Sequence, residues 1–120
     1  MSNKETLLTA MRELFHDKDV TALDRYWAEP YIQHSPNLPD GLDGLRAAVP
    51  TLEGFRWNPE RVFEDGDFVI AHSRVSGWHP DGDAAIVDIF RFENGRVVEH
   101  WDVVQPYVEA DLTVSGNPVV

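Results

Sequence analysis

Three ionisable residues near the end of the chain could do acid–base chemistry, because they interrupt two segments that otherwise look suited to a protein core. Asp88, His100 and Asp102 stand within Ala85–Pro106, which reads AIVDIFRFENGRVVEHWDVVQP. An ionisable side chain on a buried sheet face costs free energy unless it is paired or used in function. We therefore take these three residues as the candidate site.

Whether the three groups meet depends on the turn between the two segments. The apolar and β-branched residues on both sides of Glu93-Asn94-Gly95 predict a β-hairpin. A two-residue turn would pair Glu93 with Arg96, and Asp88 would then lie opposite Trp101 and face away from His100.

A three-residue loop gives a different result. With Gly95 as a left-handed bulge, Asp88 would lie directly across from His100, and Asp102 would lie across from Ile86 on the same face. We favour this register because it also gathers apolar side chains around the polar groups, namely Phe90, Phe92, Val98 and Ile86.

Composition limits the class of protein. A chain of 120 residues with 42% hydrophobic residues predicts one globular domain. The net charge of −11 argues against nucleic acid and anionic membranes as partners, because both require basic patches. The chain has no cysteine, which excludes disulfides and thiolate chemistry. The N-terminus reads as a polar helix start, and no apolar run approaches membrane-spanning length, so we expect a cytoplasmic protein.

The first half of the chain predicts three helices. Ser2 and Glu5 have capping-box spacing before an apolar helical pattern. A second short helix is expected at about 20–28, and Tyr31–Pro36 should be extended because it precedes a proline. Asp43 can cap a third helix, which Pro50 must kink or shorten.

After Gly54 the pattern changes to the alternation of strands. A hairpin turn is expected at Asp65-Gly66 and a strand over Phe68–Val75, with a loop over Gly77–Asp83 before the long hairpin. The tail from Tyr107 carries little pattern. Helices followed by antiparallel strands predict an α+β domain, in which a strongly curved sheet and the helices across it form a cone with an apolar interior.

This order of elements, with YIQHSPN at Tyr31–Asn37 and VDIFRFENGRVVEHWDVVQP at Val87–Pro106, resembles the SnoaL-like polyketide cyclase group of the nuclear transport factor 2-like superfamily. The resemblance implies a conical curved antiparallel (mixed) sheet wrapped around N-terminal helices, with a deep pocket and a homodimer formed through the sheet. Members include cofactor-free aldol cyclases, a ketosteroid isomerase and an epoxide hydrolase, and many members only bind ligands or partners. The fold alone therefore does not determine the activity.

The resemblance also suggests roles for single residues. Asp102 in EHWD is similar in position to the aspartate acid/base of the cyclases, and Asp88 and His100 match polar positions that line the pocket. His34 matches the histidine at the mouth of the cone, and His72 matches a pocket-facing position of the third strand. The hydrolase branch uses an Arg-x-Asp arrangement, and no arginine stands two places before Asp88, which argues against an epoxide hydrolase.

We therefore expect an enzyme that performs an aldol-type cyclisation or an isomerisation on a small hydrophobic carbonyl compound. Asp102 would remove the proton flanked by two carbonyl groups, since an apolar wall can raise the pKa of a carboxyl group. His100 and His72 would donate hydrogen bonds to the developing oxyanion, and His34 would orient the substrate or shuttle the proton. The proposed substrate-binding residues are His72, Tyr31, Gln33, Trp78, Phe90 and Arg74.

Other interpretations of the same residues remain open. Asp88 could simply fix the ring of His100. The Asp–His pair could also be purely structural, with each side chain hydrogen-bonding the other inside the sheet of a non-catalytic binding or dimerisation module. Trp101 should lie on the opposite face, where it would pack in a dimer. A metal site is possible if His34, His72, His100 and Asp88 converge, but no short ligand motif is present, so we expect neither a metal nor another cofactor.

Overall fold

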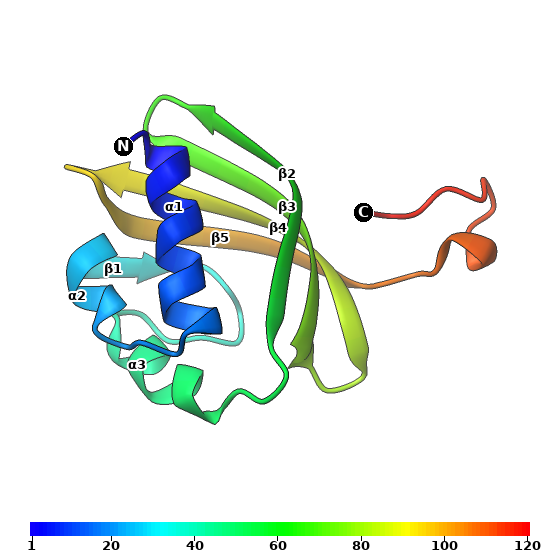
Figure 1. The fold of residues 1–120 in the computed structure, drawn as a ribbon, viewed down its shortest axis with the longest axis horizontal. Helices are drawn as coiled ribbons and strands as arrows, with labels where there is room; N and C mark the ends of the chain where they lie inside the picture. Colours follow the sequence, from blue (N-terminus) through cyan, green and yellow to red (C-terminus); the bar gives the residue numbers. More distant parts are fainter.

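A computed structural model, which describes residues 1–120, contains one curved sheet with the helices packed against its concave side (Figure 1). The strand order is β1-β5-β4-β3-β2, and the sheet is not closed. β1 is parallel to β5, and all other neighbours are antiparallel. The strands are β1 (Trp27–Gln33), β2 (Arg56–Asp65), β3 (Phe68–His79), β4 (Gly82–Glu93) and β5 (Arg96–Pro106). The predicted α+β fold with a curved mixed sheet is confirmed.

The helix α1 (Asn3–Met11) lies across the concave face and continues as a π-helical segment, η1 (Arg12–His16). Its start is the predicted capping box, in which the Ser2 hydroxyl accepts the Glu5 N–H and the Glu5 carboxylate accepts the Ser2 N–H. One face of this helix is buried against the sheet, and its fully buried side chains are Leu7, Ala10 and Leu14. Burial of this apolar stripe fixes the helix over the sheet.

The second predicted helix is shorter than expected. α2 spans Ala22–Tyr26, and Trp27 already has the extended backbone of β1 and pairs with Val97 of β5. The predicted helix ran on to residue 28 because Leu23, Tyr26 and Trp27 share one helical face. Hydrogen bonding to β5 outweighs this local pattern, since a strand pairing satisfies the backbone groups that a helix end leaves free.

The third helix, α3 (Asp43–Ala48), passes into a 3-10 turn, η2 (Val49–Thr51), and the shortening at Pro50 was predicted. The prediction that Asp43 caps this helix is wrong. The N-cap is Leu42, and no side chain caps the helix. Asp43 instead occupies the first turn, where its negative charge is favourable for the helix dipole.

The predicted loop over Gly77–Asp83 is wrong as well. β3 extends to His79 and β4 starts at Gly82, so only Pro80-Asp81 form the turn. The ladder shifts register here, and Gly77 has a φ of 75°. A Cβ at this position would lie 2.6 Å from the carbonyl oxygen of Gly54. Glycine is therefore needed here, because the backbone at Gly54 passes very close to Gly77. The first hairpin turn is Gly66-Asp67, one residue later than predicted, because Asp65 pairs with Phe68.

After β5 the chain forms only a short 3-10 turn, η3 (Ala110–Leu112), and in Figure 1 this tail extends away from the sheet. The Arg74 guanidinium lies 3.8 Å from the ring centroid of Tyr107 and 3.2 Å from a Glu109 carboxylate oxygen. No helix of the chain is both long enough and apolar enough to cross a lipid bilayer.

The two faces of the sheet have different environments. On β3 the concave face is buried and the outer face is partly open, as the alternation of its side chains predicts. The buried side chains are Val69, Ala71, Ser73 and Val75. Ile70, His72 and Arg74 point the other way, so a polar residue can reach the interior of the cone only from the concave register of its strand.

Candidate active site

The turn of the β4–β5 hairpin decides which residues reach the concave face. Glu93 pairs with Arg96, so Asn94 and Gly95 form a two-residue turn, with φ values of 52° and 78°. The preferred three-residue loop is therefore wrong, and the alternative two-residue turn is correct. Asn-Gly is the sequence that best tolerates two successive positive φ values.

A β-bulge directly after the turn changes the register. Phe92 pairs with Val97, but Arg91 pairs with Glu99, so Val98 has no partner on β4. One extra residue on one strand turns every following side chain to the opposite face. Without the bulge, the two-residue turn would have separated the candidate residues.

The shifted register brings all three candidate residues to the concave face. Phe90 pairs with His100, and Asp88 pairs with Asp102. The predicted direct pairing of Asp88 with His100, and of Ile86 with Asp102, is wrong by two residues. The predicted convergence on one face is nevertheless correct, because a shift of two residues preserves the alternation of side chains.

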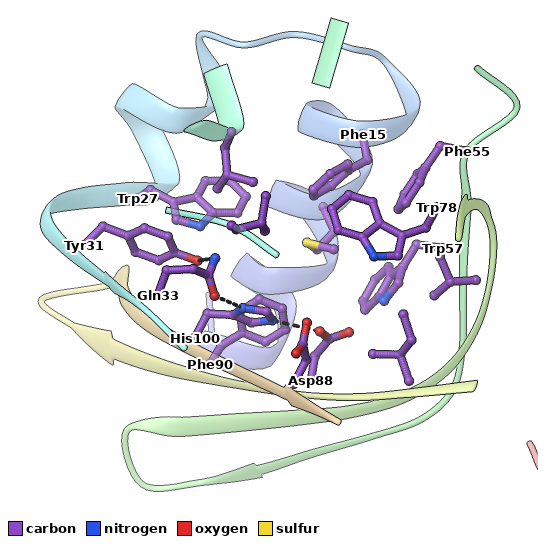
Figure 2. A pocket seen from close by; sticks show the side chains of 16 residues that line it. Phe15, Trp27, Tyr31, Gln33, Phe55, Trp57, Trp78, Asp88, Phe90 and His100 are labelled. Carbon is purple, nitrogen blue, oxygen red and sulfur yellow. Dashed lines mark hydrogen bonds and ion pairs between the residues drawn. The ribbon is translucent and has the colours of Figure 1, made fainter. Parts of the chain in front are cut away.

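These residues form part of the wall of a pocket between the sheet and the helices (Figure 2). The empty space at this site is about 570 Å³, a figure that includes the open solvent at its mouth. Twelve of the sixteen lining residues are hydrophobic, so the polar groups stand out against an apolar wall. The lining residues are Met11, Phe15, Trp27, Tyr31, Gln33, Leu38, Leu45, Phe55, Trp57, Val75, Trp78, Ile86, Asp88, Phe90, His100 and Asp102.

His100 is hydrogen-bonded on both sides, to the buried Asp88 and to the half-buried Gln33. Its Nε2 lies 2.8 Å from Oδ1 of Asp88, and its Nδ1 lies 2.7 Å from Oε1 of Gln33, as the dashed lines in Figure 2 mark. Asp88 and His100 are only 8% and 7% exposed. Gln33 reaches His100 because the two residues are register partners in the parallel β1–β5 pair. Both ring nitrogens are therefore engaged within the protein.

Gln33 makes two further hydrogen bonds. Its Oε1 accepts the backbone N–H of Ser35 at 3.0 Å, and its Nε2 donates to the Tyr31 hydroxyl at 3.3 Å. Burial of Tyr31 raises the pKa of its hydroxyl well above the usual range, and the hydrogen bond from Gln33 partly opposes this shift. Tyr31 therefore remains a neutral hydroxyl at the pocket wall.

Asp102 differs from Asp88 in that its carboxylate accepts no hydrogen bond within the chain, whereas Asp88 accepts one through Oδ1. The Oδ1 of Asp102 is buried and accepts no hydrogen bond. A buried polar atom without a partner costs free energy, and such an atom in the wall of a pocket is a candidate for a functional role. An oxygen of this kind can accept a proton or a hydrogen bond from a bound ligand.

Asp88, His100 and Asp102 each offer an atom within 4.8 Å of the others, a separation at which three groups could hold a cation. In the structure, however, His100 Nε2 is hydrogen-bonded to Asp88. The ligand set considered from the sequence does not converge, because His34 and His72 lie on the other side of the sheet.

His34 lies outside the pocket, which corrects its expected place at the pocket mouth. Its Nε2 lies 2.7 Å from a Glu99 carboxylate oxygen, and its ring stacks on Trp101 with centroids 4.7 Å apart. The hydrogen bond from His34 lowers the pKa of Glu99, and Arg91 lowers it further. As expected, Trp101 faces away from His100, since neighbours along a strand point to opposite faces.

His72 and Arg74 are also outside the pocket, and their expected roles as pocket-lining residues are wrong. The His72 Nδ1 lies 2.7 Å from Arg61, and the Arg74 Nε donates to Asp83 at 2.8 Å. Both stand on the outer face of β3 because the concave register of this strand belongs to the odd-numbered residues. His72 therefore cannot reach an oxyanion in the pocket.

The remaining candidates, Tyr31, Gln33, Trp78 and Phe90, do line the pocket. Trp57 also lines the pocket, and it was not among the residues predicted from the sequence. Its side chain is 6% exposed, and its indole N–H has no partner. The alternation that starts after Gly54 was a signal for it, since Trp57 falls on the same side of β2 as the buried register of β3. Met11 and Phe15, from α1 and η1, also line the pocket.

A comparison with protein families places this geometry among known relatives. Residues 8–100 match the SnoaL-like domain. The chain belongs to the SnoaL-like domain family. This match begins at Leu8 within α1, covers all of β1 to β4, and ends at His100 in β5. No curated protein matches the sequence.

Solved structures support the same fold for this SnoaL-like chain. A proposed polyketide cyclase from Acidithiobacillus ferrooxidans is 21% identical with a TM-score of 0.72, over 88% of this chain and 89% of that protein. A nuclear transport factor 2-like protein of unknown function from Cytophaga hutchinsonii is 14% identical with a TM-score of 0.75, over 88% and 92%. A further nuclear transport factor 2-like protein of unknown function, from Burkholderia pseudomallei, is 26% identical with a TM-score of 0.68, over 88% and 93%. These likenesses establish the cone-shaped α+β fold.

Proposed function

We propose that this SnoaL-like protein is an enzyme that performs cofactor-free acid–base chemistry on a carbonyl compound, by an aldol-type cyclisation or an isomerisation. The observation that carries the proposal is the unpartnered carboxylate oxygen of Asp102 in the wall of an apolar pocket. A base must keep one oxygen free for the proton that it removes, and Asp102 meets this requirement. Asp88 is less suited, since its Oδ1 is bound to His100 and only its Oδ2 lacks a partner, whereas neither oxygen of Asp102 accepts a hydrogen bond within the chain.

The proposed reaction conserves all atoms. Asp102 removes a proton from the carbon between two carbonyl groups, and the electrons of that C–H bond form an enolate. The enolate carbon attacks a second carbonyl carbon of the same molecule, whose π electrons move to its oxygen. The resulting alkoxide is then protonated, and Asp102 returns to its ionised form. In an isomerisation the proton is returned to another carbon instead.

The apolar wall supports this chemistry and indicates the class of ligand. A proton on carbon is only weakly acidic, so a base screened from water reacts with it more readily than a solvated carboxylate does. The substrate would be a small, largely hydrophobic carbonyl compound whose rings or chains contact Phe90, Trp78 and Trp57. The proposed polyketide cyclase of similar fold supports the same class.

Proton abstraction can be tested before the natural substrate is known. Ethyl benzoylacetate carries an acidic carbon between two carbonyl groups, and its exchange with deuterium in D₂O is followed by NMR. We expect the protein to accelerate this exchange and Asp102→Asn to reduce the acceleration by about 10²- to 10⁴-fold. Asp81→Asn is the matched control, because the Asp81 side chain is 88% exposed. Equal exchange by Asp102→Asn and the parent protein, with the fold intact, would exclude Asp102 as the base.

A non-catalytic ligand-binding protein is the second candidate function. The predominance of hydrophobic lining residues favours it, as does the closed hydrogen-bond network around His100. This candidate predicts that hydrophobic ligands raise the melting temperature while no carbonyl compound exchanges faster in the presence of the protein. The exchange assay therefore separates the two candidates.

We also propose that the protein is a homodimer formed through the outer face of the sheet. Register pairs align Phe63, Ile70, Ile89 and Trp101 in one row across four strands. Phe63 is 60% exposed and Val103 is 68% exposed, and a second copy would bury such a face. Sedimentation velocity should give the mass of a dimer for the parent and of a monomer for Val103→Glu. Leu8→Glu, on α1, should leave the mass unchanged.

A further inference from the structure

The side-chain amide of Gln33 is hydrogen-bonded to the backbone N–H of Ser35, just after β1, and to two side chains of the pocket, Tyr31 and His100. We infer that Gln33 is a positioning residue that fixes the proton arrangement of the site: His100 carries a proton on Nδ1, and its Nε2 shares a single proton with Asp88. This inference deepens the proposed function, on which its catalytic meaning rests. It concerns the proton positions, which can be observed without any substrate.

The first step is the orientation of the amide. The backbone N–H of Ser35 can only donate a hydrogen bond, and the Gln33 atom 3.0 Å from it must therefore be an acceptor. This assigns the oxygen, Oε1, to the side of Ser35 and His100. The NH₂ group then faces the Tyr31 hydroxyl, at 3.3 Å. The reversed amide would place its NH₂ group against the Ser35 N–H, two donors facing each other, and the hydrogen bond to Ser35 would be lost.

The second step is the tautomer of His100. Its Nδ1 lies 2.7 Å from the same Oε1, which has no hydrogen to donate, so Nδ1 must carry the proton. Nε2 lies 2.8 Å from Asp88 Oδ1. A bare Nε2 facing a bare carboxylate would repel it, so one proton lies between them. The pair is then imidazolium with carboxylate or imidazole with carboxylic acid, and in both forms it is neutral.

The third step concerns the charges around this pair. Tyr31 faces it from β1, and Asp102 faces it from β5 beside Asp88 on β4. The lining residues from α1, η1, β2 and β3 carry no charge. Because the Asp88–His100 pair is neutral, an ionised Asp102 is the single net charge of the pocket.

The network also determines which protons are available to a ligand. Gln33 Nε2 donates to the Tyr31 oxygen, so the hydrogen of the Tyr31 hydroxyl is turned away from Gln33, and it forms no hydrogen bond within the chain. This hydroxyl can donate to the carbonyl oxygen of a ligand. It would take the role of oxyanion donor that the sequence analysis had given to His72 and His100, whose nitrogens are directed elsewhere.

The tautomer is directly observable. In the full chain labelled with ¹⁵N-histidine, long-range ¹H–¹⁵N spectra distinguish a protonated ring nitrogen from a bare one, and His100→Gln identifies the signals of His100 among the five histidines. We expect Nδ1 of His100 to be protonated in the folded parent protein. In Gln33→Met, which removes the acceptor but keeps the length of the side chain, we expect His100 to change to the Nε2–H tautomer and donate to Asp88.

Gln33→Glu is the matched control, because a carboxylate can still accept from Ser35 and His100, and the Nδ1 proton should be retained. A merely structural role for Gln33 would not reverse the tautomer in one variant and preserve it in the other. If Gln33→Met fails to fold, the spectrum of the parent protein and that of Gln33→Glu decide. A bare Nδ1 in the parent protein overturns the inference. So does an unchanged tautomer in folded Gln33→Met, or a stoichiometric metal ion bound to Nε2 in the purified protein.

The failure of this inference and that of the proposed function give different results. If Asp102→Asn exchanges the carbonyl probe as fast as the parent while His100 shows the expected tautomer, the acid–base function fails and the proton arrangement stands. If the tautomer is the opposite one while Asp102→Asn loses exchange activity, the proposed base stands and the role of Gln33 fails.

Discussion

Two aspartates on adjacent strands should have opposite effects on stability when each is replaced by leucine. Asp102 has a buried oxygen without a partner, and Asp88 accepts a hydrogen bond from a buried histidine. Their Cα atoms are register partners, and both side chains line the same pocket. The sign of the change in the free energy of unfolding therefore shows whether each carboxylate has the hydrogen-bond partners that it needs.

The magnitudes follow from the contacts. Asp102→Leu removes an unpartnered polar atom and adds apolar surface to an apolar wall, which should stabilise the protein by about 1–2 kcal/mol. We use the lower part of the usual range because Asp102 is only half-buried. Asp88→Leu leaves Nε2 of His100 without its partner in a site that is 7% exposed, which should destabilise by about 1–3 kcal/mol.

Urea unfolding followed by tryptophan fluorescence measures both values, and for a chain of this size each kcal/mol corresponds to roughly 3–6 °C in melting temperature. The stabilised Asp102→Leu should have lost the exchange activity, as expected when a strained group serves function. The reasoning is refuted if Asp102→Leu is less stable than the parent protein, or if both substitutions destabilise equally, since the two carboxylates would then be equally well satisfied.

Two further predictions concern the outer face and the β3 bulge. The pKa of Glu99 is lowered by His34 and Arg91, so ionised Glu99 stabilises the fold above its unfolded-state pKa, and this stability is lost as the pH falls through the lower folded-state pKa. Relative to the parent, His34→Gln should be least stable above the unfolded-state pKa of Glu99, and this difference should disappear as the pH falls below the folded-state pKa, as measured by thermal unfolding in a pH series. Gly77→Ala should lower the free energy of unfolding by more than about 1 kcal/mol in urea, because a Cβ would meet Gly54 and the φ is positive; a neutral effect would contradict this reading.

The fold was predictable because its determinants are local. The capping box at Ser2, the proline at position 50 and the alternation after Gly54 each act over a few residues, and the structure contains the features they predict. Errors occurred where a distant partner decided the outcome. Trp27 is in a strand because β5 pairs with it, and Gly77 lies in a bulged strand because Gly54 approaches it closely.

The candidate site was predictable only in part, and for the same reason. The polar residues of the hairpin could be identified as out of place, and Asp88, His100 and Asp102 do share one face. The faces of β1 and β3, in contrast, depend on register relative to the rest of the sheet. His34 and His72 have the residue types expected of a site, but each stands one position away from the concave register.

The bulge at Val98 explains why the predicted turn and residue pairs of the hairpin were wrong although its polar residues do share one face. An Asn-Gly turn and a shared polar face are incompatible in a regular two-stranded ladder, because the turn fixes the register and the register fixes the faces. The sequence satisfies both by placing one extra residue in β5, and Val98 is 6% exposed, so this residue is packed rather than looped out. β1 pairs with β5 on both sides of this bulge, from Trp27 opposite Val97 to Gln33 opposite His100. The same irregularity that turns His100 inward therefore also positions the amide that holds its Nδ1, and deletion of Val98 should disconnect Gln33, His100 and Asp88 together.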